Sequence, residues 1–233
     1  MCAKPQRWEP SNSGGTLLPV DREADWRKVL GHLAEGRTEV LLCSDETWSD
    51  PLPDCLSSGE CEQAGKFRRD ADRKAFVAGR LLMRTVIARF LEIPTLADIP
   101  IETGEKGKPF CPLSGAPAFN LSHTRGWLGL AIRGQGPVGV DLEDTRRKVR
   151  HLDLARRYFS DAEVARVEAD GEKTFFQIWT RKEALVKCMG VGLTVSLREL
   201  DTFALEAEGR CQFQEIAPAP FLQGCLVTDT DAH

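Results

Sequence analysis

The longest regular pattern of apolar residues predicts a helix over residues 72–91. Apolar side chains such as Phe76 and Val86 recur there at steps of three and four residues, which places them on one face of an α-helix. A second pattern of the same period covers residues 173–189 and stops at Gly190. Glycine is common directly after the last turn of a helix, so this segment predicts a second long helix.

Two shorter segments carry the signature of a helix start. Ser57 is followed by Glu60, and Ser160 is followed by Glu163. At this spacing the serine side chain accepts a hydrogen bond from the third helical residue, whose carboxylate turns back to the serine N–H. We therefore expect helices to begin near both serines, the second one running toward Ala169.

Short apolar runs predict the strands. They lie at residues 40–43, 127–132, 137–143, 200–205, 211–216 and 222–227. The turn-forming residues 133–136 separate two of these runs, so we expect residues 127–143 to form a hairpin. Helices and strands together predict an α+β protein.

Two segments lack a strong pattern. Residues 93–119 are rich in proline and glycine and are expected to loop, with a brief strand pairing near Ile99–Ile101. Residues 1–20 are expected to form a flexible lead-in.

Composition excludes several classes of protein. The chain has 233 residues, 42% of them hydrophobic, and a net charge of -4, which argues against a protein built mainly to hold nucleic acid. No apolar run reaches the ~18–20 residues of a membrane span, and the polar residues 1–15 lack the apolar core of a signal peptide. The eight cysteines are scattered without a Cys-x-x-Cys pair. A cytoplasmic protein with reduced cysteines is expected.

Acidic residues stand out at the end of the run 137–143. Asp141 and Glu143 share one face of the predicted strand, because a strand alternates its faces. On the later helix, Glu183 and Lys187 are four residues apart and lie on one side. If the strand end meets this helix, three carboxylates converge, and such a cluster repels itself unless a hard divalent cation sits among them.

Each acid also has an ordinary interpretation. Glu143-Asp144 followed by Arg146, Arg147 and Lys148 could form a local salt-bridged turn, and Glu183 with Lys187 could be an exposed helical ion pair worth ~0.2–0.5 kcal/mol. Lys182, in contrast, falls within the apolar stripe of its helix. It must extend to the surface or pair with a carboxylate at the edge of the core.

Two polar segments are candidates for phosphate binding. Asn120, Ser122 and His123 could form a turn, or a clamp for a phosphate or ribose. The glycine-flanked loop with Lys106, Gly107 and Lys108 could be a solvated turn, or could hold phosphates by charge. It is not a Walker loop, because a proline follows Lys108.

Taken in order, several segments resemble the 4'-phosphopantetheinyl transferase family, and in particular its longer, single-chain, surfactin-type branch. They are Gly107-Lys108-Pro109, Asn120-Leu121-Ser122-His123, Gly139-Val140-Asp141-Leu142-Glu143, Phe159-Ser160 with Glu163, and Trp179-Thr180-Arg181-Lys182-Glu183-Ala184 with Lys187. Residues 73–84 also resemble the first helix of these enzymes. The resemblance extends from about residue 65 to residue 195.

The resemblance implies an α+β fold of two similar α/β halves, related by a pseudo-twofold axis and forming a cleft that binds coenzyme A. The halves would be residues 21–125 and residues 126–233, the second carrying the metal site. The implied enzyme is a monomeric holo-[carrier protein] synthase. It moves the 4'-phosphopantetheine arm of coenzyme A to a serine of an apo acyl, peptidyl or aryl carrier protein and leaves adenosine 3',5'-bisphosphate.

The motifs also imply roles for individual residues. Asp141, Glu143 and Glu183 would hold Mg²⁺ on the pyrophosphate, and Glu183 and Lys187 would be the catalytic residues, with Glu183 as the base for the carrier serine, directly or through a water. The residues implied to contact coenzyme A are Arg73, for which Lys66, Arg68 and Arg69 are competitors, and Lys106, Gly107, Lys108, Asn120, Ser122, His123 and Lys187.

Two other functions remain open at this point. Acids with a lysine also serve magnesium-dependent nucleases and phosphodiesterases, although the acidic balance and the aromatic-poor basic segments disfavour nucleic acid as a partner. A carrier-binding adaptor without catalysis is the second. The expected partners are coenzyme A and an acidic carrier protein, with no nucleic acid and no membrane. Basic side chains at residues 146–150 or 156–157 are candidates for docking the carrier.

Overall fold

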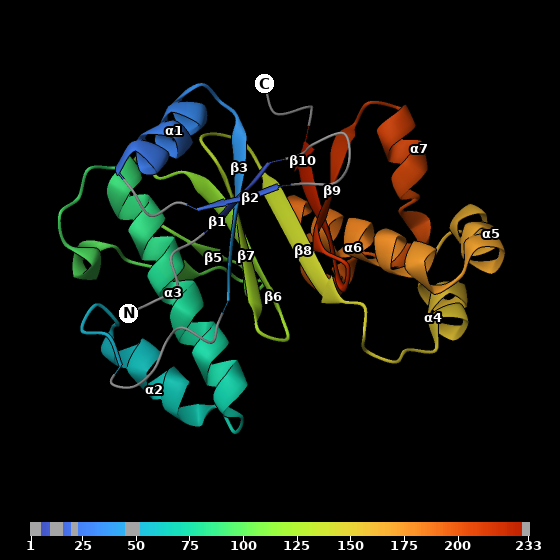
Figure 1. The fold of residues 1–233 in the computed structure, drawn as a ribbon, viewed down its shortest axis with the longest axis horizontal. Coiled ribbons are helices and arrows are strands. Elements are labelled where there is room, and N and C mark those ends of the chain that lie inside the picture. Colours follow the sequence, from blue (N-terminus) through green and yellow to red (C-terminus); the bar gives the residue numbers. More distant parts are fainter. Residues whose placement is uncertain (1–5, 10–15, 20–22, 45–51, 230–233) are drawn as a thin grey trace.

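The computed structural model describes residues 6–9, 16–19, 23–44 and 52–229. It has two halves, each with an antiparallel sheet and a long helix lying across it (Figure 1). The expected α+β architecture of two α/β halves is confirmed.

The first half is built on a sheet with the strand order β2-β1-β3-β7-β6. Its strands are β1 (Gln6–Glu9), β2 (Thr16–Pro19), β3 (Thr38–Ser44), β6 (Ala118–Thr124) and β7 (Trp127–Arg133). Its helices are α1 (Glu23–Ala34), α2 (Ser58–Lys66) and α3 (Asp70–Phe90). The 3-10 turn η2 (Leu96–Asp98) and the small ladder of β4 (Glu102–Thr103) and β5 (Pro109–Phe110) complete this half.

The second half has a sheet with the order β8-β10-β9. Its strands are β8 (Val138–Asp144), β9 (Cys211–Ala219) and β10 (Leu222–Asp229). The helices are α4 (His151–Tyr158), α5 (Asp161–Asp170), α6 (Glu172–Met189) and α7 (Thr202–Ala207), with the 3-10 turns η3 (Gly192–Thr194) and η4 (Leu197–Glu199).

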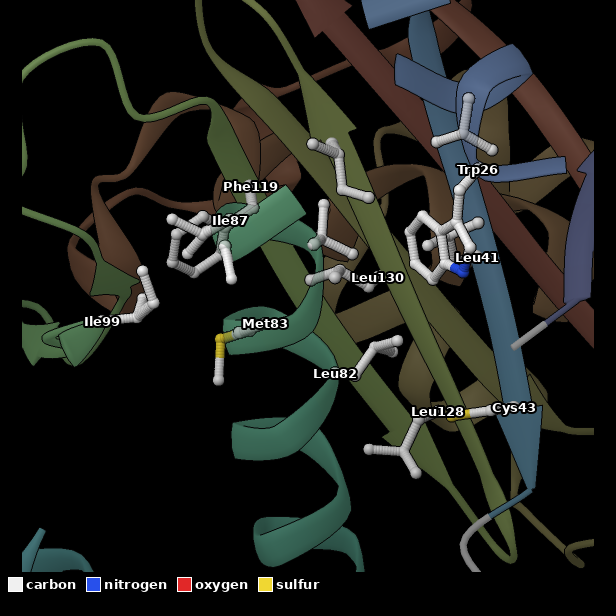
Figure 2. Packing of buried hydrophobic residues seen from close by; sticks show 14 of the residues in the cluster. Trp26, Leu41, Cys43, Leu82, Met83, Ile87, Ile99, Phe119, Leu128 and Leu130 are labelled. Atoms are coloured by element: carbon white, nitrogen blue, oxygen red, sulfur yellow. The ribbon is translucent and has the colours of Figure 1, made fainter. Parts of the chain in front are cut away.

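Alternating residues of the strands separate the layers of the molecule. In β3, Leu41 and Cys43 belong to the core beneath α1 and α3, and Figure 2 shows them together with Met83 and Leu130. The neighbouring residues Val40 and Leu42 belong to a second core, which they share with apolar side chains of β8 and β10. The period of two along β3 therefore gives this strand two apolar faces.

Helix boundaries agree closely with the sequence. Ser57 and Ser160 each form the predicted capping box, with Glu60 and Glu163 respectively. Helix α6 ends at Gly190, whose φ of 67° is left-handed and suits a residue without a Cβ. Helix α3 starts two residues before the predicted range and ends one residue short of it.

The predicted hairpin of residues 127–143 is wrong. Strand β7 pairs with β3 and β6, and β8 pairs with β10. The turn between β7 and β8 therefore connects two different sheets. Because β7 belongs to the first sheet and β8 to the second, the chain passes from one half to the other within residues 134–137. The predicted boundary between the halves lay earlier, between residues 125 and 126.

Four other segments differ from the predictions. Residues 118–124 form a strand and not a turn. Residues 202–207 form a helix and not a strand, because the Asp201 side chain caps the N–H groups of Phe203 and Ala204. The short pairing occurs at residues 102–103 and not at 99–101. Within the lead-in, residues 6–9 and 16–19 are strands that pair with each other, and its other residues lie outside the described part. Within the described residues, no helix is both long and apolar enough to cross a membrane.

Candidate functional site

Side chains join the two halves along the free edge of β8. Three N–H groups of β8, those of Val140, Leu142 and Asp144, point toward β6, and each donates to a polar side chain. The acceptors are Asn120 Oδ1 at 2.8 Å, Ser122 Oγ at 3.1 Å and Thr124 Oγ1 at 3.1 Å. We call these three acceptors the seam ladder. It replaces the backbone ladder that would otherwise satisfy this strand edge.

Two lysines satisfy carbonyl groups on the same edge. Lys108 Nζ donates to the Val138 carbonyl at 3.0 Å and also to the Lys187 carbonyl at 2.7 Å, near the end of α6. Lys187 Nζ donates to the Val140 carbonyl at 3.2 Å. Burial lowers the pKa of Lys108, because a charged ammonium is less stable away from water. Lys108 thus links the first half to both β8 and α6.

Asp141 is the acid at the centre of the seam. Its Oδ1 accepts from Lys187 Nζ at 2.7 Å and from Ser122 Oγ at 3.0 Å. Its Oδ2 is buried, and among the described residues it has no hydrogen-bond partner. Burying a carboxylate oxygen without a hydrogen-bond partner costs free energy. A ligand that binds this atom would remove that cost.

Glu143 lies two residues further along the same face of β8. Its Oε1 accepts from Arg147 Nη2 at 2.9 Å, and the Trp179 side chain also hydrogen-bonds its carboxylate. Burial and the charge of Asp141 nevertheless raise the pKa of Glu143 to about 7. The carboxylate is therefore in a site that disfavours a further negative charge.

Glu183 approaches from α6, as the helical spacing predicted. Burial raises its pKa, and the charge of Asp141 raises it further, whereas Lys187 acts in the opposite direction. Asp141 therefore lies within electrostatic range of both glutamates. Within the described part of the chain, however, no three His, Cys, Asp or Glu side chains form a group that could hold a metal ion.

One contact brings α6 close to β8, and a second joins α6 to α5. Gly139 lies so close to the helix that a Cβ would collide with the Ala184 carbonyl oxygen and the Cys188 amide nitrogen. One turn earlier, Lys182 Nζ pairs with Glu163 at 2.7 Å, with both side chains fully buried. Of the two alternatives expected for Lys182, extension to the surface or pairing with a carboxylate, the structure shows the pairing. The pair places Glu183, the next residue, at the seam.

Comparison with known proteins identifies the family. A model described as the 4'-phosphopantetheinyl transferase superfamily matches residues 137–226, and one described as 4'-phosphopantetheinyl transferase, N-terminal, matches residues 43–134. The chain is 33% identical over 171 residues to the 4'-phosphopantetheinyl transferase AcpT of Salmonella typhimurium, covering 64% of this chain and 84% of AcpT. It belongs to the 4'-phosphopantetheinyl transferase superfamily.

Two further relatives support the assignment. A Synechocystis protein named for the same transferase is 33% identical over 170 residues, covering 70% of this chain and 68% of its own. The transferase Sfp of Bacillus subtilis is 32% identical over 154 residues, covering 64% of this chain and 66% of Sfp. These relatives come from different sources and do not single out one branch of the family. Membership of the surfactin-type branch therefore stays a prediction.

In this transferase, most of the residues predicted to contact coenzyme A lie in the seam or in a cavity beside it. Asn120, Ser122 and Lys108 are engaged in the seam itself. Lys106, Gly107, Lys108, Asn120 and Lys187 line one cavity of about 200 Å³ together with Gly190 and Gly192. Their contacts with coenzyme A stay predictions.

His123 lies on the opposite face of β6 from Ser122. It is exposed and borders a neighbouring cavity of about 420 Å³, lined also by Phe76, Arg80 and Asp72. The two cavities share Pro109 and Leu121, so they are adjacent. Arg73 is half-buried in the first turn of α3 and is not among the residues that line either cavity.

The basic segment after β8 is largely neutralised by local pairs. Arg146 and Arg147 bind Asp144 and Glu143, and Arg150 pairs with Asp153. The alternative of a salt-bridged turn after Glu143 is therefore confirmed. The sequence left such pairs as an alternative to a metal site. In the structure, Arg147 binds Glu143, which is one of the acids predicted to hold the metal.

Sequence reasoning missed Thr124 as a member of the seam ladder. Its signal was available in the spacing, because polar residues at positions 120, 122 and 124 share one face of a strand.

Proposed function

We propose that this protein transfers the 4'-phosphopantetheine arm of coenzyme A to a serine of an apo carrier protein, with Mg²⁺ bound at Asp141, Glu143 and Glu183. Membership of the superfamily supports the reaction. The observation that carries the site is the arrangement of Asp141 between Ser122 and Lys187, with Glu143 and Glu183 in its electrostatic range.

The oxygen donors are of the kind that the proposed cation prefers, but in the described part of the chain they are not gathered into a metal-binding group. Mg²⁺ prefers hard oxygen ligands and commonly takes only a few carboxylates, with substrate phosphates completing its shell. Asp141 Oδ2 is buried without a partner among the described residues. Burial, together with the charge of Asp141, raises the pKa values of Glu143 and Glu183, so a cation would stabilise the charged forms of these acids. When bound, the ion would neutralise charge that develops on the pyrophosphate.

The reaction forms one bond and breaks one bond. The hydroxyl oxygen of the carrier serine bonds to the phosphorus next to pantetheine, and the bond from that phosphorus to the bridging oxygen breaks. Adenosine 3',5'-bisphosphate leaves with the bond electrons. Glu183 is the proposed acceptor of the serine proton: burial raises its pKa, and a carboxylate with a raised pKa is a stronger base than an ordinary one.

Lys187 is proposed to stabilise the leaving phosphate. Its side chain is 28% exposed, and its ammonium binds Asp141 and Ser122. Lys187 also lines the cavity formed with Lys106 and Gly190. A cation fixed beside a developing negative charge lowers the barrier. The enzyme supplies no nucleophile, because the attacking serine belongs to the carrier.

A mass measurement tests the function. Protein incubated with Mg²⁺, coenzyme A and an apo carrier protein is expected to increase the mass of the carrier by one phosphopantetheine group. Asp141→Asn and Glu183→Gln, which keep size and remove charge, are expected to lower the rate by roughly a hundredfold or more. Undiminished transfer by folded variants would reject the assigned roles.

The matched control is Asp161→Asn. Asp161 is an exposed acid in the first turn of α5, and its removal changes the net charge equally. Turnover of a phosphodiester without a carrier would favour the nuclease alternative. Binding of a carrier with no mass increase would favour an adaptor. Neither alternative has a specific observation in its support.

A further inference from the structure

Arg147 holds one of the proposed metal ligands. Its Nη2 donates to Glu143 Oε1 at 2.9 Å, and the tight turn that follows β8 brings it there through a hydrogen bond from the Arg147 N–H to the Asp144 carbonyl at 3.2 Å. The guanidinium also lies over the ring of Phe176 on α6, 5.6 Å from the ring centre. The side chain is 33% exposed and that of Glu143 is 17% exposed.

The pairing of Arg147 with Glu143 is incomplete. A guanidinium can bind a carboxylate through two parallel hydrogen bonds, but here a single one is formed. Within the described part of the protein, Arg147 Nε is buried and has no hydrogen-bond partner. The contact therefore uses only part of the hydrogen-bonding capacity of the guanidinium.

The neighbouring Arg146 shows what a complete pair looks like in the same turn. Its Nε donates to Asp144 Oδ1 at 2.9 Å and its Nη2 donates to Asp144 Oδ2 at 2.7 Å. Its guanidinium lies 4.1 Å from the ring centre of Phe221. Two consecutive arginines thus bind two nearby acids, one in bidentate geometry and one through a single bond.

We propose that Arg147 is an exchangeable counter-ion, which pairs with Glu143 in the metal-free protein and must release it when a divalent cation binds. The inference rests on the metal site of the proposed function. Positive charge close to a cation site opposes the entry of the cation, and the bond to Glu143 must also be broken. Arg147 therefore weakens the affinity of the site for metal and sets the concentration at which it fills.

Metal binding tests the proposal without any measurement of turnover. Mn²⁺, which has oxygen-ligand preferences like those of Mg²⁺, is titrated into the metal-free full chain, and free Mn²⁺ is followed by electron paramagnetic resonance. Arg147→Gln is expected to tighten binding about fivefold or more, equivalent to ~1 kcal/mol. Arg147→Ala gives the same expectation and serves if the glutamine variant does not fold.

Arg146→Gln is the matched control. It removes the same charge one residue away, but Arg146 binds Asp144, which is not among the proposed ligands. Equal affinities of the Arg147→Gln and Arg146→Gln variants, or weaker binding by Arg147→Gln, would overturn the proposal. Asp141→Asn separates this result from a failure of the site: if wild-type binding of Mn²⁺ does not depend on Asp141, it is the proposed metal site that fails.

Discussion

Gly139 of β8 lies directly against the Ala184 carbonyl of α6, without room for a side chain between them. Gly139 is not among the residues with a positive φ, so it is the close approach to α6, and not the backbone conformation, that requires a glycine here. The contact sets the distance between the strand that carries Asp141 and the helix that carries Glu183.

Gly139→Ala is accordingly expected to separate β8 from α6. Overpacking against backbone atoms that cannot rotate away should lower the free energy of unfolding by at least about 2 kcal/mol and should reduce transfer in proportion to the lost geometry. Gly31→Ala is the control, because a Cβ at this position in α1 meets nothing within 4 Å and alanine favours a helix by ~1 kcal/mol. Urea unfolding compares the two, and equal stabilities would contradict this account.

The contribution of the seam ladder to stability can be tested at Thr124, the last of its three acceptors. Thr124→Val keeps the shape of the side chain but removes the acceptor of the Asp144 N–H. A part-buried donor left without a partner should cost about 1–2 kcal/mol of stability. Thr103→Val, on the exposed strand β4, should change stability by no more than ~0.5 kcal/mol. Chemical denaturation measures both changes in stability. Equally small losses for the two variants would show that the seam ladder does not stabilise the protein.

The buried pair of Lys182 and Glu163 predicts strong coupling. Lys182 Nζ also donates to the carbonyls of Leu197 and Leu200, and burial lowers the pKa of this lysine. Lys182→Met should cost about 3–5 kcal/mol, because it leaves a buried carboxylate without its counter-charge.

The double variant Lys182→Met with Glu163→Gln should be less damaging than the sum of the single changes. Lys173→Met, at an exposed position of the same helix, is the control. Thermal unfolding of all four proteins completes the cycle. Additive effects would show that the two side chains do not stabilise each other.

Glu60 predicts a pH-dependent loss of stability in acid. Burial by itself would raise the pKa of Glu60, but the Ser57 N–H and Arg84 stabilise its carboxylate, so the net pKa lies below 4.5. A carboxyl with a depressed folded-state pKa contributes stability above its unfolded pKa, and this is lost as the pH falls through the folded value. Glu60→Gln should therefore be destabilised by about 2 kcal/mol at pH 7.

The difference should shrink below about pH 4, where the wild-type carboxyl also begins to gain its proton. Glu62→Gln changes an exposed acid of the same helix and should show no such dependence. Urea unfolding at several pH values measures both. A Glu60→Gln deficit that stays constant into acid would argue against the ion pairs of Glu60 as its cause.

Local signals in the sequence predicted local structure well. The capping serines 57 and 160 and the glycine at 190 marked helix ends to within about one residue, because these signals act through hydrogen bonds a few residues apart. The alternation of β8 correctly placed Asp141 toward α6 and Val140 toward the core. The position of Lys182 in an apolar stripe left two alternatives, extension to the surface and pairing with a carboxylate, and the structure shows the second.

Pairing between distant strands could not be read in the same way. The turn at residues 134–136 is equally suitable for a hairpin and for a crossing between sheets, and the choice depends on β3 and β10, which are remote in sequence. The same limit applied to Asn120 and Ser122. Their polarity suited a phosphate clamp, whereas the structure uses them as acceptors for an adjacent strand edge.

The seam ladder has a mechanical consequence. Oxygen atoms on rotatable bonds connect β6 to β8, so a small tilt of one half against the other can be absorbed by side-chain torsions. A continuous backbone ladder would resist the same movement. The joint therefore tolerates a change of angle but not of register, because a displacement of two residues would leave one of the three donors without an acceptor.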